Sequence, residues 1–157
     1  MKLSECFKEE NFVPELKAAR KEEAIREMVQ QLCATQHLTK EQGATVERAV
    51  IRREELGTTG IGKGMAVPHA KIPGLTGING VFGRSRQGVE FSSLDGQPVK
   101  LVFMLVSSPE PVDAHLKMLK KVMALMKDGE FCAFLQRAQG RTELAELLRE
   151  ADERVKA

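Results

Sequence analysis

Histidine and arginine are the residues through which this chain could handle a phosphoryl group, and the sequence holds three histidines in 157 residues. One of them, His69, follows Pro68 at the end of the apolar run Met65-Ala66-Val67. A neutral imidazole leaves one ring nitrogen free as a nucleophile near pH 7, which suits a reversible phosphoryl carrier. We therefore interpret His69 as the nucleophile of a phosphoryl-carrying site.

The segment before His69 has the composition of an anion-binding loop. Four glycines between residues 57 and 64 permit positive φ angles and a close approach of the backbone to a ligand. Successive N–H groups in such a loop can form an anion-binding nest. Thr58, Thr59 and Gly60 are weaker candidates for phosphate contacts, and the two threonines could equally cap backbone groups. Pro68 ends an extended run here, because it fixes its own φ and lacks an N–H.

The same loop, residues 57–63, fits the first part of the P-loop pattern, which would predict nucleotide binding. That pattern next requires Ser or Thr to hold Mg²⁺, and the chain has Gly64 there. A P-loop also follows a buried strand and opens a helix. Here Val46–Glu55 is predicted to be a helix, and Met65–Lys71 is predicted to be a strand. Both differences argue against a nucleotide site.

A longer pattern carries the most specific signal. Glu54, six further residues and then Ile61-Gly62-Lys63-Gly64-Met65-Ala66-Val67-Pro68-His69-Ala70 resembles the phosphohistidine signature of enzyme IIA domains of the bacterial phosphotransferase system (PTS). The branch is the fructose/mannitol type, which includes the nitrogen-regulatory IIA proteins. The resemblance implies that His69 accepts a phosphoryl group through Nε2 from the phosphocarrier protein HPr or its paralogue. It also implies that Arg53 and His115 flank the active histidine. No cofactor is expected for this step, and no metal site is expected because no cluster of His, Cys and acidic residues has metal-ligand spacing.

Each flanking residue has a structural interpretation beside the functional one. Arg53 is a cation near the end of a predicted helix, where the helix dipole favours positive charge, and Arg52 is a neighbouring candidate for the same role. His115 shares a helical face with apolar residues, as a hydrogen-bonded core histidine would. The resemblance favours a site role for both Arg53 and His115.

Three uses of the phosphoryl group remain open at this stage. The chain could use its phosphorylation state as a regulatory signal to a target protein. It could instead pass the group to a IIB domain and then to sugar, or it could be a binding module that has lost transfer. The sequence contains no IIB, IIC or HPr domain, which favours a free-standing IIA protein of the nitrogen-regulatory kind.

Composition predicts one soluble domain over residues 1–157, with 42% hydrophobic and 29% charged residues. The net charge of +2 is too small to indicate nucleic-acid binding. The sequence has no membrane span and no signal-peptide pattern. Cys6, Cys33 and Cys132 lack paired spacing and are expected to be free thiols in a reducing cytoplasm.

Periodicity predicts an α/β fold in which helices flank a mixed sheet of about five strands on both faces. Leu101–Val106, without a polar interruption, is typical of a central strand covered on both sides. Thr39 and Gln42 have the spacing of a capping box at a helix start, and Asp113 is the expected N-cap of the helix that carries His115. The remaining predicted elements are an edge strand at 12–16, helices at 21–36, 130–138 and 142–155, and strands at 80–85 and 88–91.

Overall fold

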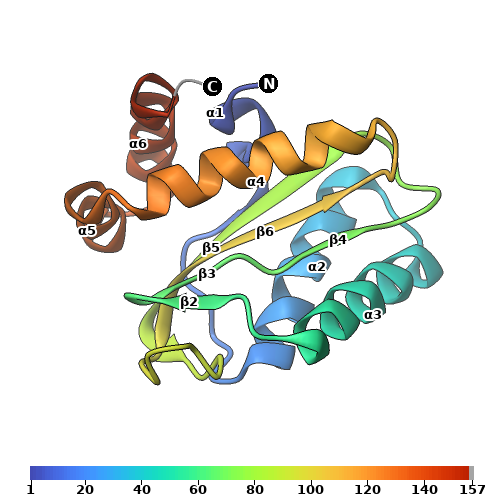
Figure 1. Ribbon diagram of the computed structural model, residues 1–157, viewed down its shortest axis with the longest axis horizontal. Helices are drawn as coiled ribbons and strands as arrows, with labels where there is room; N and C mark the ends of the chain where they lie inside the picture. Colours follow the sequence, from blue (N-terminus) through green and yellow to red (C-terminus); the bar gives the residue numbers. More distant parts are fainter. Residues whose placement is uncertain (156–157) are drawn as a thin grey trace.

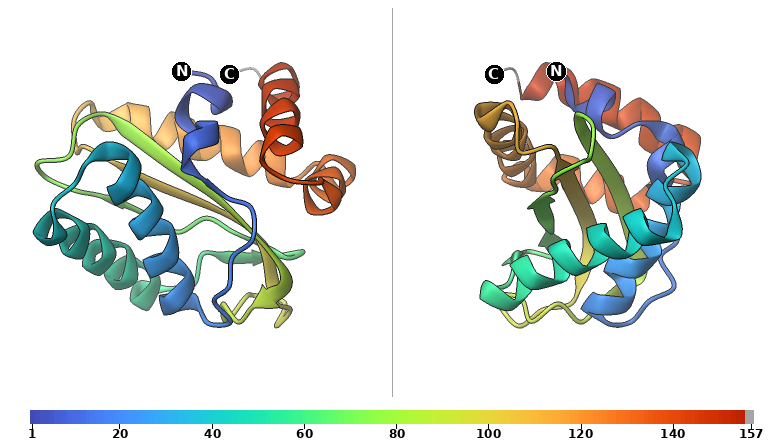
Figure 2. Two further views of the ribbon diagram at one scale, coloured as in Figure 1. Left: turned by 180° about the vertical axis from the view of Figure 1, so that it is seen from behind. Right: turned by 90° about the vertical axis from the view of Figure 1, so that its right-hand side faces the viewer.

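A six-stranded mixed sheet separates two layers of helices in the computed structural model, which describes residues 1–155 (Figures 1 and 2). The strands are β1 (Phe12–Val13), β2 (Gly60–Gly62), β3 (Met65–Ala66), β4 (His69–Lys71), β5 (Ile78–Val89) and β6 (Val99–Ser107). The helices are α1 (Leu3–Cys6), η1 (Glu9–Asn11, a 3-10 helix), α2 (Lys21–Gln36), α3 (Lys40–Leu56), α4 (Val112–Met126), α5 (Gly129–Arg137) and α6 (Arg141–Arg154). The predicted α/β class and the helices on both faces are confirmed.

Strand β6 is the centre of the sheet. It pairs antiparallel with β5 along one side, and parallel with β3 and then β4 along the other. Successive β6 side chains enter opposite cores: Leu101, Phe103 and Leu105 pack with α4–α6 and α1, whereas Val102, Met104 and Val106 pack with α2 and α3. All six are fully buried. Both faces of this apolar strand are therefore covered by helices, as predicted.

The predicted strand Met65–Lys71 is divided into β3 and β4, and the short strand β2 was not predicted. With two other predicted strands merged into β5, the strand number rises from about five to six. Pro68 has no N–H, and the Val67 N–H donates to Thr59 O at 3.1 Å outside the ladder. Leu105 N still donates to Pro68 O at 2.9 Å, so the chain stays beside β6 through the interruption. His69 then resumes pairing opposite Leu105.

Local rules predicted some boundaries better than others. Thr39 caps α3, and its hydroxyl accepts from Gln42 N at 3.1 Å, which confirms the capping box. Asp113 is not the cap of α4: the N-cap is Pro111, and Asp113 lies in the first turn and pairs with Lys117 at 3.4 Å. The two strands predicted at 80–85 and 88–91 form the single strand β5 with an irregular register. The N-terminal α1 and η1 were not predicted.

A buried arginine joins the sheet to the C-terminal helices. Arg84 of β5 is 1% exposed, and its Nη1 donates to Leu135 O at 3.0 Å and to Ala138 O at 2.5 Å at the end of α5. Its Nε donates to Pro14 O at 3.2 Å. These bonds satisfy the last carbonyls of a helix with a cation, which also suits the helix dipole.

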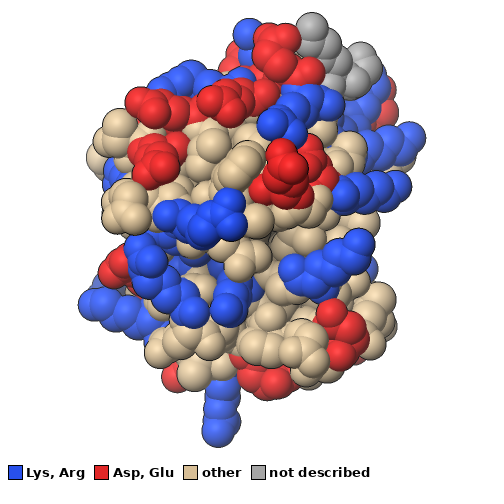
Figure 3. Space-filling model, turned by 90° about the vertical axis from the view of Figure 1, so that its left-hand side faces the viewer, with Lys and Arg blue, Asp and Glu red and all other residues tan. Residues whose placement is uncertain are grey.

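Charges of both signs share the face drawn in Figure 3, where Lys and Arg lie beside Asp and Glu. No helix among residues 1–155 is long and apolar enough to cross a membrane. Cys6, Cys33 and Cys132 are free thiols, as predicted.

Candidate functional site

Three elements distant in sequence bring Arg53, His69 and His115 to one groove of about 850 Å³. Arg53 lies in the last turn of α3, His69 begins β4, and His115 lies in the first turns of α4. Helices α3 and α4 flank β4 in Figure 1. The two imidazole rings have centroids 5.7 Å apart. The structure thus brings together the three residues that the sequence singled out as a group.

His69 is held in one tautomer by its own backbone. Its Nδ1 lies 2.8 Å from Val67 O, and a carbonyl oxygen only accepts, so Nδ1 carries the proton and Nε2 has a free lone pair. Burial lowers the pKa of His69 from its usual value of 6.5, and the nearby Arg53 charge lowers it further, against the opposing effects of the Val67 bond and Glu54. The ring is therefore neutral at pH 7, with Nε2 available as a nucleophile.

His115 is more deeply buried than His69, at 4% exposure. Its Nδ1 makes a short hydrogen bond with Ser107 Oγ at the end of β6. Burial lowers the pKa of His115 to about 4, and the charges of His69 and Lys71 add to this effect. His115 is therefore also neutral at pH 7. Sequence reasoning missed Ser107, because a serine that follows a run of apolar strand residues carries no signal of its own.

Arg53 combines the two interpretations offered for it. Its Nη1 donates to Gly57 O at 2.9 Å, just beyond the end of α3, as a helix-end cation does. Its side chain also lines the groove beside His69. Arg52 lines the same groove and is exposed, so two guanidinium groups border the histidines.

Thr58, Thr59 and Gly60 do not line this groove, and their polar groups are used elsewhere. Thr58 Oγ1 donates to Phe91 O at 2.8 Å and accepts from Gly60 N at 3.0 Å. Thr59 donates through its N–H and its hydroxyl to the Glu54 carboxylate. The sequence left two interpretations of these threonines, phosphate contacts or caps of neighbouring groups. In the structure both threonines cap neighbouring groups.

The rim of the groove is apolar and exposed. Leu56, Val112 and Leu116 line it with exposed fractions of 86%, 63% and 52%. Three exposed apolar side chains therefore lie at the edge of the groove that contains the two histidines. Among residues 1–155, no group of three or more His, Cys, Asp or Glu side chains could hold a metal ion.

Comparison with known proteins identifies the family of this chain. Residues 5–151 match the family model described as "Phosphoenolpyruvate-dependent sugar phosphotransferase system, EIIA 2". The chain is 36% identical over 137 residues to a "Nitrogen regulatory protein" of Bradyrhizobium diazoefficiens, covering 87% of both proteins. It is 32% identical over 152 residues to the "PTS system fructose-specific EIIABC component" of Bacillus subtilis, of which it spans 24%.

Solved structures extend the likeness to the whole fold. The crystal structure of the nitrogen regulatory protein IIA-Ntr from Neisseria meningitidis superposes with a TM-score of 0.84 at 27% identity, covering 93% of this chain and 98% of that one. The complex of enzyme IIAMTL with phosphorylated enzyme IIBMTL from Escherichia coli matches with a TM-score of 0.73 at 26% identity, over 90% and 95% of the two chains. With the family model covering most of the sequence, the chain belongs to the EIIA type 2 family of the phosphoenolpyruvate-dependent sugar phosphotransferase system.

Proposed function

We propose that His69 is the phosphoryl acceptor of this chain and that Nε2 is the atom that is phosphorylated. Domains of this family are phosphotransferase components that receive phosphoryl groups on histidine. The observation that carries the assignment is the bond from Nδ1 to Val67 O, which leaves the Nε2 lone pair in the groove that contains Arg53 and His115. His37, the third histidine, is exposed at the end of α2 and lies outside this groove.

The reaction is a direct exchange between two histidines. The Nε2 lone pair of His69 forms a bond to phosphorus while the bond from phosphorus to the donor's ring nitrogen breaks, and the electron pair leaves with the donor ring. The transition state carries negative charge on three equatorial oxygens, so positioning and electrostatics supply most of the catalysis. The cationic Arg53 offsets that charge. His115 donates to a phosphoryl oxygen when the Ser107 hydroxyl donates to its Nδ1, because its own proton is then on Nε2.

The rim of the groove supports a protein as the phosphoryl donor. Leu56, Val112 and Leu116 offer apolar contact area, and Arg52 and Lys71 add positive charge beside them. Apolar side chains together with arginine are typical of protein interfaces. We assign the donor as an HPr-like phosphocarrier, with the chain acting as a single IIA domain in the cytoplasm.

Regulation by phosphorylation state is the favoured use of the phosphoryl group. The similarity to proteins named nitrogen regulatory supports it, both in sequence and in structure. Transfer to a IIB domain is the second candidate, supported by the likeness to enzyme IIAMTL, which was solved in complex with phosphorylated enzyme IIBMTL. In either case the phosphoryl group is first held on His69.

Phosphoryl transfer to the purified chain tests the proposal. The chain is mixed with phosphoenolpyruvate, enzyme I and HPr or its paralogue, and its intact mass is followed. We expect an acid-labile gain of one phosphoryl group that His69→Ala abolishes and that the matched control His37→Asn retains, since His37 has a φ of 54° that Asn tolerates. Arg53→Ala is expected to slow transfer without unfolding. Absence of any gain with both donors would support a binding module, whereas unaltered labelling of His69→Ala would refute the assignment.

A further inference from the structure

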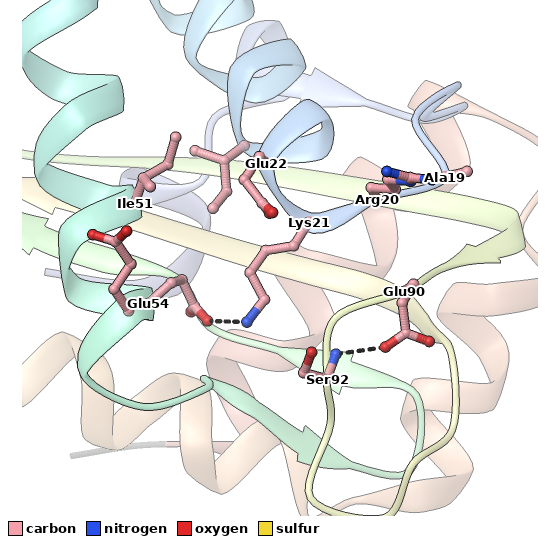
Figure 4. A pocket seen from close by; sticks show the side chains of 10 residues that line it. Ala19, Arg20, Lys21, Glu22, Ile51, Glu54, Glu90 and Ser92 are labelled. Atoms are coloured by element: carbon pink, nitrogen blue, oxygen red, sulfur yellow. Dashed lines mark hydrogen bonds and ion pairs between the residues drawn. The ribbon is translucent and has the colours of Figure 1, made fainter.

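We propose that Glu54 is a positioning residue that fixes the ring of His69 from a second cavity beside α3, through Thr59 and Val67. The inference rests on the proposed role of His69 and adds residues that do not line its groove. Glu54 follows Arg53 in α3, but its side chain is only 2% exposed. It points into a second cavity of about 700 Å³, shown in Figure 4, whereas Arg53 lines the groove of the histidines.

An ion pair holds the Glu54 carboxylate in this second cavity. Lys21 Nζ, at the start of α2, lies 3.0 Å from Glu54 Oε2 (dashed in Figure 4). The Lys21 side chain is itself 16% exposed, and its Nζ lies 5.1 Å from the centre of the Phe91 ring. A buried carboxylate needs such a partner to remain charged. The pair therefore fixes a full negative charge at one position beneath the end of α3.

From Glu54 a continuous series of hydrogen bonds leads to His69. Thr59 N donates to both carboxylate oxygens of Glu54, at 3.2 and 3.1 Å, and the Thr59 hydroxyl donates to Oε1. Thr59 O accepts from Val67 N at 3.1 Å. Val67 O in turn accepts from Nδ1 of His69 at 2.8 Å. Thr59 and Val67 are each 4% exposed, so water does not substitute for these partners.

The Val67 carbonyl is the critical link, because it sets the tautomer of His69. Val67 lies between β3 and β4, where its N–H has no partner in the ladder and is held by Thr59 instead. If the Thr59 backbone moves, Val67 turns and its carbonyl leaves Nδ1. A free imidazole prefers its proton on Nε2, and that tautomer removes the nucleophilic lone pair from the groove.

Glu54 also acts on His69 through its charge. It raises the pKa of His69, whereas burial and Arg53 lower it. The other charged or titratable groups that line the groove of His69 are His115 on α4, Lys71 on β4, and Arg52 and Glu55 on α3. Glu54 is the carboxylate whose charge raises the pKa of His69, so its removal is expected to lower that pKa.

The test compares Glu54→Gln, the double variant Lys21→Met/Glu54→Gln and the control Glu22→Gln. A glutamine side chain can accept on one oxygen only, so Glu54→Gln loses part of the hold on Thr59. The double variant leaves no unpaired lysine, and it provides the measurement if the single variant does not fold. Glu22 lines the same cavity but is exposed, so its variant removes a charge there without touching the series of bonds.

Two readouts are used: ¹⁵N NMR of the His69 ring, and steady-state transfer from phosphorylated HPr. Both Glu54 variants are expected to lose Nδ1–H tautomer and to lower the His69 pKa. They are also expected to reduce kcat by roughly ten- to a hundredfold, the cost of small misplacements of a reacting group, with KM for the donor unchanged. The Glu22 variant is expected to match the wild type in both readouts.

A wild-type tautomer and kcat in folded Glu54 variants would overturn the proposal. Recovery of both readouts in the double variant would also overturn it, since the unpaired lysine would then explain the single variant. If the wild-type chain accepts no phosphoryl group but the tautomer still shifts in both Glu54 variants, the positioning role stands and the proposed function of His69 fails.

Discussion

Acidification should destabilise the fold through His115, and the size of the effect follows from its burial. The pKa of His115 is about 4 in the folded chain against a usual value of 6.5, because burial disfavours the charged ring. Between these two values the unfolded chain binds more protons than the folded one, so stability falls as pH falls. The contribution of His115 to the free energy of unfolding is fully present above about pH 7 and lost by about pH 4. At about 1.4 kcal/mol per pKa unit, the difference between the two pKa values sets an upper bound of about 3.5 kcal/mol on this contribution.

The assay is urea unfolding at several pH values for the wild type and His115→Asn. Asn retains an amide where Nδ1 meets Ser107 Oγ but does not titrate. The difference between the two proteins in free energy of unfolding, followed against pH, therefore reports His115 alone, because the carboxylates are common to both. We expect the wild type to lose about 2–3 kcal/mol relative to the variant between pH 7 and pH 4. NMR titration of the ring supplies the folded pKa directly.

The reasoning would be refuted if the free energies of unfolding of the wild type and His115→Asn changed equally with pH. It would also be refuted if the His115 ring titrated near its usual pKa. The first result would mean that His115 is equally solvated in both states, contrary to its 4% exposure. The burial has a functional consequence as well. A neutral His115 at pH 7 offers a hydrogen bond to a phosphoryl oxygen rather than a positive charge, and Arg53 supplies the charge.

Three other predictions concern stability and docking. Arg84→Met should cost about 3 kcal/mol in urea unfolding, because it leaves the buried carbonyls of Leu135 and Ala138 without a donor; a loss below about 0.5 kcal/mol would contradict that role. Thr39→Ala should cost about 1 kcal/mol by loss of the α3 cap, measured as a lower Tm with unchanged transfer. Leu116→Asp should leave stability within about 0.5 kcal/mol, because the side chain is exposed. It should raise KM for the phosphoryl donor about tenfold, and an unchanged KM would place docking elsewhere.

Much of the secondary structure could be predicted because it depends on local rules. Helices α2 and α3 follow from their apolar stripes and, for α3, from the capping box at Thr39. The burial of β6 on both faces follows from its unbroken apolar run. Where competing local signals stood side by side, prediction was weaker: Pro111 rather than Asp113 caps α4, and β5 continues through the glycine at position 88.

For the candidate site, as for the fold, the sequence predicted some features and left others open. The sequence by itself determined the residue types and their spacing: a histidine after a proline, an arginine sixteen positions before it, and a second histidine far along the chain. These were sufficient for the family, because the pattern of residues 54–70 is long and specific. The sequence did not separate the structural and functional interpretations of Arg53, Thr58 and Thr59, since a cap and a ligand contact require the same residue types.

Only the tertiary structure decided which atoms face one another. The free Nε2 of His69 depends on the position of the Val67 carbonyl, and that position depends on Thr59 and Glu54 across a strand interruption. Ser107 is adjacent to His115 only because β6 and α4 pack together. Hydrogen bonds and burial of this kind arise between elements brought together by the shared sheet, and the spacing of residues along the chain does not encode them.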